Sequence, residues 1–257
     1  MSFAVAAEAY DRFMGRYSTP LAPLFVDFGH VAPGQRVLDV GAGPGALTGA
    51  LVERIGPAWV TAVDPSEPFV AALRERNPGV EVQQASAESL PFDDAGFDAT
   101  LAQLVVHFMR DPVTGLREMR RVTVPGGVVA ASVWDHGGGH GPLSVYWEAV
   151  RELDPASEGE AHLAGATEGD LTRLFEQAGM TDVDEDPLTV NVEHTTFDEW
   201  WEPYTLGVGP AGSYVAGLEA DRRALLRERC REMLPPAPFV LTALAWAARG
   251  FVSPVSR

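Results

Sequence analysis

The chain has 257 residues, of which 46% are hydrophobic, 21% charged and 9% aromatic. This length and composition exclude a disordered or fibrous protein and indicate one α/β core with appended helices. Thirty-six acidic and 19 basic residues give a formal net charge of −17. A nucleic-acid partner is disfavoured because such a protein repels phosphate backbones.

Cys230 is the only cysteine, so the sequence excludes an internal disulfide and a cysteine-ligated zinc site. The first ten residues lack the basic start of an export signal, and no apolar run approaches the ~20 residues of a membrane span. We therefore expect a cytoplasmic protein with no membrane partner. The arginines of residues 222–231 alternate with apolar positions at helical spacing, which is typical of the solvated face of an amphipathic helix.

The N-terminal stretch has helical spacing. Its large apolar side chains between residues 10 and 17 fall at i, i+3, i+4 and i+7. Proline interrupts a helix, so Pro20 and Pro23 predict two short helices leading into the core rather than one continuous helix.

From residue 36 onward, short β-rich runs alternate with stretches of helical length. Strands separated by helices require right-handed crossovers and therefore a parallel sheet. The expected strands are Arg36–Val40, Trp59–Val63, Val80–Gln84, Ala99–Gln103 and Val128–Val133, with helices that include Ala46–Ile55 and Phe69–Arg76.

The pattern changes after the fifth strand. A glycine-rich loop over residues 136–140 precedes helices near Leu143–Leu153 and Leu171–Ala178, a strand near Leu188–His194, an aromatic segment Phe197–Tyr204 and an apolar closing run Phe239–Ala248. We predict a doubly wound, Rossmann-like α/β fold with a seven-stranded sheet, mostly parallel with an antiparallel closing strand, and lid helices near both ends of the chain. The expected single domain, 1–257, comprises N-terminal helices (1–35), a cofactor-binding core (36–135), and substrate-side helices, lid and final strands (136–257).

The most informative motif is residues 37–45, Val-Leu-Asp-Val-Gly-Ala-Gly-Pro-Gly, where a strand runs into a glycine loop and then a helix. Glycine allows positive φ and a close approach of the backbone to a ligand, while the helix N-terminus offers free N–H groups. Gly41, Gly43 and Ala46 also satisfy the dinucleotide fingerprint, so both NAD(P) and S-adenosylmethionine (SAM) remain open.

Two carboxylates bear on this choice. Asp39, just before the loop, would repel a pyrophosphate but attract the ammonium and sulfonium charges of SAM. Asp64 ends the second strand nineteen residues past Gly45, where a carboxylate can accept the hydroxyls of a ribose. Both cofactors carry a ribose, so Asp64 supports the fold more than the choice of cofactor.

Further motifs follow in order: an Ala-Glu loop at 87–88, Leu-Pro-Phe at 90–92, Phe-Asp at 97–98 and Pro-Gly-Gly at 125–127. Together, the motifs over residues 36–134 resemble the class I SAM-dependent methyltransferases, in particular the small-molecule type 11 group related to ubiquinone and menaquinone C-methyltransferases. The resemblance implies SAM as cofactor and S-adenosylhomocysteine (SAH) as product.

The resemblance also implies a set of cofactor contacts. It assigns Asp39, Gly41 and Gly43 to the methionine end of SAM and Asp64 to the ribose, with Ala87 and Glu88 at the adenine rim and Gln103 near the carboxylate or sulfonium; we add Ala42, Pro65 and Tyr10 to the predicted cofactor site. One departure is Ser86, where the family commonly has aspartate, so that adenine contact is not carried over to this chain.

We expect methyl transfer to an oxygen or carbon atom of a small apolar or aromatic acceptor. His107, just beyond the fourth strand, is the first candidate for a general base; the alternative is that it packs against the cofactor or caps a helix. Asp135 and His136, after the fifth strand, are the second candidates. No metal is expected, because three glycines separate His136 from His140 in a flexible loop.

Aromatic residues predict a lid. Aromatic rings in a lid would exclude water and attract a positive charge, and the candidates are Tyr10, Trp200, Trp201 and Tyr204, together with His140. The alternative is that these rings are a hydrophobic anchor for the added helices. Two other functions remain open. One is an NAD(P)-dependent oxidoreductase, and the other is a SAM-binding protein without methyl transfer or a SAM-assisted cyclase.

Overall fold

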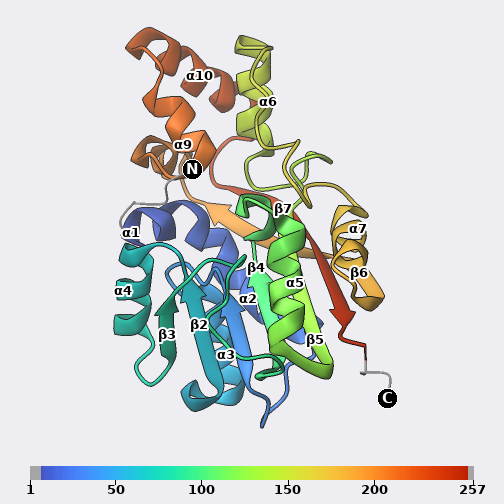
Figure 1. Cartoon of the computed structure of the whole chain (residues 1–257). Coiled ribbons are helices and arrows are strands. Elements are labelled where there is room, and N and C mark those ends of the chain that lie inside the picture. The colour runs from blue at the N-terminus through green and yellow to red at the C-terminus, as the bar shows by residue number, and fades with distance from the viewer. Residues whose placement is uncertain (1–6, 254–257) are drawn as a thin grey trace.

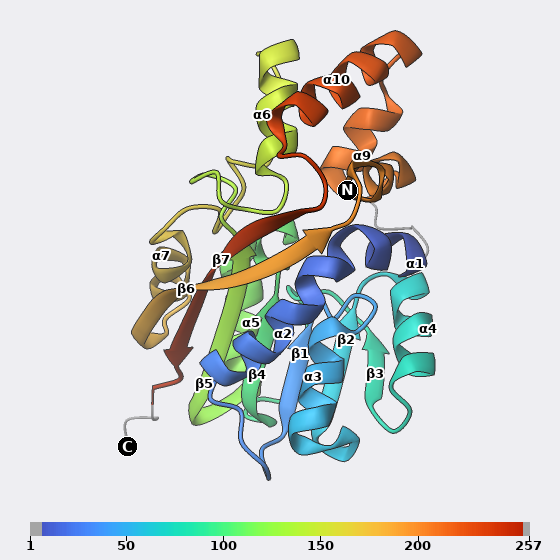
Figure 2. The same cartoon turned by 180° about the vertical axis from the view of Figure 1, so that it is seen from behind.

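The computed structural model describes residues 7–253, so residues 1–6 and 254–257 of the predicted domain lie outside the described part. Its centre is a seven-stranded sheet with the order β3-β2-β1-β4-β5-β7-β6 (Figures 1 and 2). The strands are β1 (Val37–Val40), β2 (Val60–Asp64), β3 (Glu81–Gln84), β4 (Phe97–Gln103), β5 (Thr123–Trp134), β6 (Thr181–His194) and β7 (Phe239–Phe251).

The first five strands pair in parallel, whereas β7 is antiparallel to both of its neighbours, β5 and β6. This arrangement confirms the predicted fold class and the antiparallel closing strand. The chain order reverses between β1 and β4, which is where open α/β sheets bind their ligands.

Helices cover both faces of the sheet. Figure 2 shows α2 (Arg16–Phe28) and α3 (Ala46–Ile55) on one face, and Figure 1 shows α5 (Pro112–Val122) and α7 (Asp170–Gln177) on the other. Helix α4 (Glu67–Arg76) lies beside β3. A helical cap beyond the carboxyl ends of the strands contains α6 (Ser144–Leu153), α8 (Phe197–Trp201), α9 (Gly209–Ala216) and α10 (Ala220–Met233).

The prediction of two short N-terminal helices is wrong. Helix α1 (Ala7–Tyr10) runs through a π-helical turn, η1 (Asp11–Gly15), directly into α2, and Pro20 and Pro23 lie inside α2. Both prolines are exposed on the outer side of the helix. Burial of Leu21 and Phe25 on the opposite side outweighs the two backbone hydrogen bonds that the prolines remove.

Strand β6 begins seven residues before its predicted start. The additional segment, Thr-Asp-Val-Asp-Glu-Asp-Pro, is mostly exposed and lies at the edge of the sheet, so it lacks the apolar alternation that predicts a strand. Acidic residues and Pro187 are typical of an edge strand that does not pair with another chain. Arg249 of β7 pairs with Asp184 across the two strands at 3.0 Å.

Within residues 7–253, no helix is both long and apolar enough to cross a membrane.

Candidate functional site

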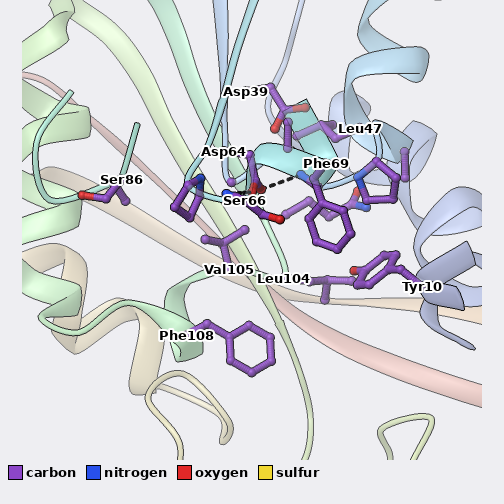
Figure 3. A pocket seen from close by; sticks show the side chains of 18 of the residues that line it. Tyr10, Asp39, Leu47, Asp64, Ser66, Phe69, Ser86, Leu104, Val105 and Phe108 are labelled. Carbon is purple, nitrogen blue, oxygen red and sulfur yellow. Dashed lines mark hydrogen bonds between the residues drawn. The ribbon is translucent and has the colours of Figure 1, made fainter. Parts of the chain in front are cut away.

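A pocket of about 520 Å³ opens at the carboxyl ends of β1, β2 and β4 (Figure 3). The glycine loop after β1 forms one wall. Gly45 at the start of α3 has a φ of +105°, which glycine adopts without strain, and this turns the chain from the strand into the helix. At Gly41, a Cβ atom would lie 2.5 Å from the side chain of Val105, so only glycine allows the loop to pack against the segment after β4.

Asp64 holds the glycine loop in place. Its Oδ2 accepts a hydrogen bond from the backbone N–H of Gly43, and its Oδ1 accepts one from the N–H of Ser66, both at 2.8 Å. Figure 3 shows the carboxylate of Asp64 at the centre of the pocket, next to Ser66. Burial raises the pKa of Asp64, although the two backbone hydrogen bonds oppose that rise. The second strand therefore ends on a carboxylate that orders the loop and also faces the pocket.

Three buried polar atoms in the pocket have no hydrogen-bond partner among residues 7–253: Asp39 Oδ1, Gln103 Oε1 and Ser18 Oγ. The other carboxylate oxygen of Asp39 accepts a hydrogen bond from Thr48 at 2.6 Å, and the Gln103 amide donates to the Ser18 carbonyl at 3.0 Å. A buried polar atom without a partner costs free energy, so this group of atoms is suited to a polar ligand. The two acceptor oxygens suit an ammonium group, and the hydroxyl can donate to a carboxylate. Together they match the two charged groups of an amino acid.

Tyr10, at the end of α1, and the first turn of α4 close the pocket from the side. The ring of Tyr10 meets that of Phe69 edge-on, with the centroids 5.5 Å apart. Asp11 of η1 forms an ion pair with Arg76 of α4 at 2.7 Å, and Arg76 also donates to the Pro44 carbonyl in the glycine loop. The N-terminal segment is thus attached to the same loop and helix that form the pocket.

A second cavity, which we call the acceptor chamber, adjoins the first. It has a volume of about 30 Å³, and Tyr10, Leu104 and Phe108 line both cavities. Leu104 has a φ of +62°, a strained conformation for a residue with a side chain, and such strain is found most often at functional sites. The remaining walls of the chamber are mostly apolar but include His107, His136 and Glu160.

The chain is similar in sequence to known methyltransferases. A methyltransferase domain family matches residues 38–131. An uncharacterized methyltransferase of Mycobacterium tuberculosis is 40% identical over 135 residues, which cover 52% of each chain. A ubiquinone/menaquinone biosynthesis C-methyltransferase of Cupriavidus metallidurans is 32% identical over 186 residues, or 63% of this chain and 74% of that protein.

The chain belongs to the SAM-dependent methyltransferases. This confirms the family that the motifs predicted, with SAM as the family's cofactor. The chain spans about half the length of the mycobacterial relative that it matches. A solved N-methyltransferase of Haemonchus contortus, in complex with phosphomonomethylethanolamine and SAH, superimposes with a TM-score of 0.59 at 18% identity, covering 96% of this chain and 57% of that one. At that identity the likeness concerns the fold alone.

The structure brings the predicted cofactor residues of the chain together. All ten line the 520 Å³ pocket: Tyr10, Asp39, Gly41, Ala42, Gly43, Asp64, Pro65, Ala87, Glu88 and Gln103. Ser86 lines it as well, and Glu88 also accepts a hydrogen bond from the Arg110 N–H at 2.7 Å. Ser18 was not predicted, because nothing in the sequence places a residue of the N-terminal helix beside the end of β4. Contacts with the cofactor itself stay a prediction.

The predicted catalytic residues separate into two groups. His107 and His136 face the acceptor chamber, with ring centroids 5.8 Å apart. Asp135 does not line it: its oxygens accept hydrogen bonds from Gly138 N, Trp246 Nε1 and His140, at 2.9, 3.0 and 2.7 Å. Asp135 therefore orders the glycine-rich loop, and His140 is exposed on that loop rather than at the chamber.

The three predicted lid aromatics of the helical cap, Trp200, Trp201 and Tyr204, do not line the cofactor pocket or the chamber. Each is less than 5% exposed, and Tyr204 stacks on Tyr146 with the centroids 4.5 Å apart. The alternative prediction, a hydrophobic anchor for the added helices, describes their position. Trp134 and Trp147 are also buried. Among the described residues, no group of three histidine, cysteine or acidic side chains is placed to bind a metal.

Glu160 is a residue that the sequence analysis missed. It lies in the irregular segment between α6 and α7, is 3% exposed, and lines the acceptor chamber. One carboxylate oxygen, Oε2, accepts a hydrogen bond from the Trp147 indole N–H at 2.8 Å. No periodic pattern or motif marks this glutamate in the sequence, since its burial depends on the packing of distant helices.

Proposed function

We propose that this protein transfers the methyl group of SAM to an oxygen or carbon atom of a small, apolar or aromatic acceptor. The observation that carries the proposal is the pair of adjoining cavities. The larger contains the polar atoms that suit the amino-acid end of SAM, and the smaller is mostly apolar. Tyr10, Leu104 and Phe108 lie where the two cavities meet.

The residues present fit the cofactor. Asp39, Gln103 and Ser18 would bind its ammonium and carboxylate, Asp64 its ribose, and Ala87 and Glu88 its adenine edge. Around Gly43 there is open space where a side chain would otherwise project, since a Cβ there would meet no atom within 4 Å. SAM, when bound, supplies a methyl group on a positively charged sulfur, which is already a good leaving group.

The protein's own contribution is then mainly positioning, which is worth up to about 7–11 kcal/mol when the reacting atoms are held in line. At about 30 Å³ the chamber has room for the reacting group of an acceptor, and its mostly apolar walls exclude water from that group. Burial lowers the pKa of His107 well below its usual value and that of His136 to about 4, so both rings are neutral near neutral pH. A neutral imidazole accepts a hydrogen bond, which would orient a hydroxyl group of the acceptor.

The charge distribution of the protein favours a small-molecule acceptor over a nucleic acid. The arginine-rich helix α10 has its charges matched by acidic neighbours: Arg229 pairs with Glu152, and Arg227 and Arg231 pair with Asp198. This leaves little free positive charge for a phosphate backbone, in agreement with the net charge of −17. The single cysteine, Cys230, is buried, which is compatible with the proposed reducing cytoplasm.

Calorimetry with SAM, SAH and NAD tests the cofactor. We expect SAM and SAH to bind and NAD not to bind, since a pyrophosphate would lie near the buried Asp39 carboxylate. Tight binding of NAD without SAM would overturn the proposal in favour of an oxidoreductase.

Incubation with methyl-labelled SAM and a panel of phenols, alcohols and 1,3-dicarbonyl compounds then tests methyl transfer. Labelled product and SAH should form together; binding of SAM without SAH formation across every acceptor class would favour a SAM-binding protein.

Cofactor binding should depend on pH through Asp39. Burial raises the pKa of Asp39 to about 7, the hydrogen bond from Thr48 opposes the rise, and Asp64 adds to it. A ligand ammonium stabilises the charged carboxylate, so binding should release a proton near neutral pH. The affinity for SAH should therefore increase from about pH 6 to 8. Calorimetry in buffers of different ionisation enthalpy measures the proton count.

The matched variant is Asp39→Asn, which keeps an oxygen for Thr48 but does not titrate. This variant should bind SAH more weakly and with no proton release. Proton uptake by the wild-type protein, or an affinity that does not change with pH, would contradict the assignment of Asp39 to the ammonium group.

A further inference from the structure

Glu160 is a buried acid without an opposite charge. Among residues 7–253 its carboxylate forms no ion pair and accepts one hydrogen bond, at Oε2 from the Trp147 indole. Burying an ionised carboxylate without a partner cation is costly, and such groups are found most often at functional sites. The position of Glu160 therefore needs an explanation beyond packing.

The position of the Glu160 carboxylate is fixed by its neighbours Gly159 and Trp147. Gly159 has a φ of +58°, and a Cβ at that position would lie 3.3 Å from the ring of Trp147. Glycine allows the loop to lie directly against the indole, which brings Glu160 into reach of the indole N–H. Because Trp147 is itself buried in α6, the carboxylate is held at a defined point of the chamber wall.

That wall has a cavity on each side. His136 and Glu160 line the acceptor chamber. Both also line a third cavity of about 60 Å³, which we call the outer cavity. The other residues of the outer cavity include Gly139, Glu148 and Arg151, which are exposed to solvent. His136 and Glu160 thus separate the buried chamber from a cavity that opens to water.

We propose that Glu160 accepts the proton that a hydroxylic acceptor loses on methylation, and passes it through the outer cavity to solvent. This inference rests on the proposed function. As the acceptor oxygen forms its bond to the methyl carbon, the bond from that carbon to the SAM sulfur breaks and its electron pair goes to sulfur. The O–H bond of the acceptor breaks as well, and its electron pair stays on oxygen. The proton moves to Glu160 Oε1, the oxygen not occupied by the Trp147 indole, and then to water. One proton leaves for each methyl group added.

The alternative bases are weaker. The lowered pKa values of His107 and His136 make both imidazoles poor proton acceptors near neutral pH, whereas burial raises the pKa of Glu160 to about 7. A base with a pKa near the working pH is the most effective in proton transfer. The titratable and charged groups around Glu160 are His107 and His136 at the chamber, Glu148 and Arg151 on α6 across the outer cavity, and the hydroxyls of Tyr146 and Tyr204.

A simple phenol tests the proposal without knowledge of the natural acceptor. The probe is phenol, which is neutral throughout pH 6 to 8, added to the full chain saturated with SAH. In the wild-type protein its affinity should increase up to about tenfold from pH 6 to 8, because the ionised Glu160 carboxylate accepts the phenol O–H. In Glu160→Gln, which keeps an acceptor for Trp147, this increase should be lost, and Glu160→Asp should restore part of it.

The controls distinguish effects on folding, on cofactor binding and on proton transfer. Glu158→Gln, an exposed acid in the same loop, should behave as the wild type. Calorimetry with SAH on the same samples tests the cofactor site on its own. If SAH fails to bind, the proposed function fails. If SAH binds but phenol does not, or if the affinity for phenol changes with pH equally in Glu160→Gln and wild type, only the role of Glu160 is overturned.

Discussion

Replacing Asp64 with alanine is expected to weaken SAH binding on the order of 100-fold. Asp64 accepts hydrogen bonds from the N–H groups of Gly43 and Ser66, and we assign the ribose hydroxyls to the same carboxylate. A hydrogen bond to a charged group is worth about 1.5–3 kcal/mol, and each 1.4 kcal/mol changes the affinity tenfold. The loss of two such bonds to the ligand accounts for the expected change, which calorimetry measures.

The control for this variant is Asp93→Ala, which removes an exposed carboxylate outside the pocket. It should bind SAH like the wild type. Since Asp64 also orders the glycine loop, the melting temperature of Asp64→Ala should fall by a few degrees, and saturating SAH should restore only part of it. An unchanged affinity would remove Asp64 from the ribose site.

Gly43→Ala should weaken SAH binding at least about tenfold while leaving the protein folded. Gly43 has a φ of +55°, so alanine costs about 1 kcal/mol of backbone strain. A Cβ at this position would meet no protein atom within 4 Å and would project from the pocket wall. The methyl group would therefore occupy space that we assign to the cofactor.

The variant Gly34→Ala distinguishes the effect of backbone strain from the effect of a methyl group that occupies the cofactor's space. Gly34 has a φ of +90°, also with no neighbour within 4 Å of its Cβ position, but it lies outside the pocket. Both variants should lose similar stability in thermal unfolding, and only Gly43→Ala should lose affinity. Equal affinity for SAH in the two variants would show that no ligand comes close to Gly43.

Local patterns predicted the first half of the chain well. The glycine loop, Asp39 and Asp64 stand at fixed distances from strand ends, and parallel strands bring such positions to one edge of the sheet. The order of strands and helices therefore predicts the cofactor pocket before any tertiary contact is known. The same reasoning located His107 and His136 near that edge.

The residues that sequence reasoning misplaced depend on contacts between distant segments. Glu160 is buried only because α6 and the cap enclose an irregular loop. Trp200 and Trp201 lie in an aromatic cluster that includes Phe197 and Tyr204, and sequence spacing does not distinguish such a cluster from a lid. Pro20 stands inside a helix because burial on the opposite side compensates for the missing hydrogen bond.

The ion pair between Asp11 and Arg76 connects the N-terminal turn to the wall of the cofactor pocket. Both side chains are about 40% exposed, and an ion pair of this kind contributes only about 0.2–1 kcal/mol. Breaking this pair alone therefore costs little, and salt lowers that cost further, whereas the ring of Tyr10 still packs against Phe69 of α4. Arg76 also donates to the Pro44 carbonyl. One guanidinium group thus joins three segments that are far apart in the sequence: the N-terminal turn, α4 and the glycine loop.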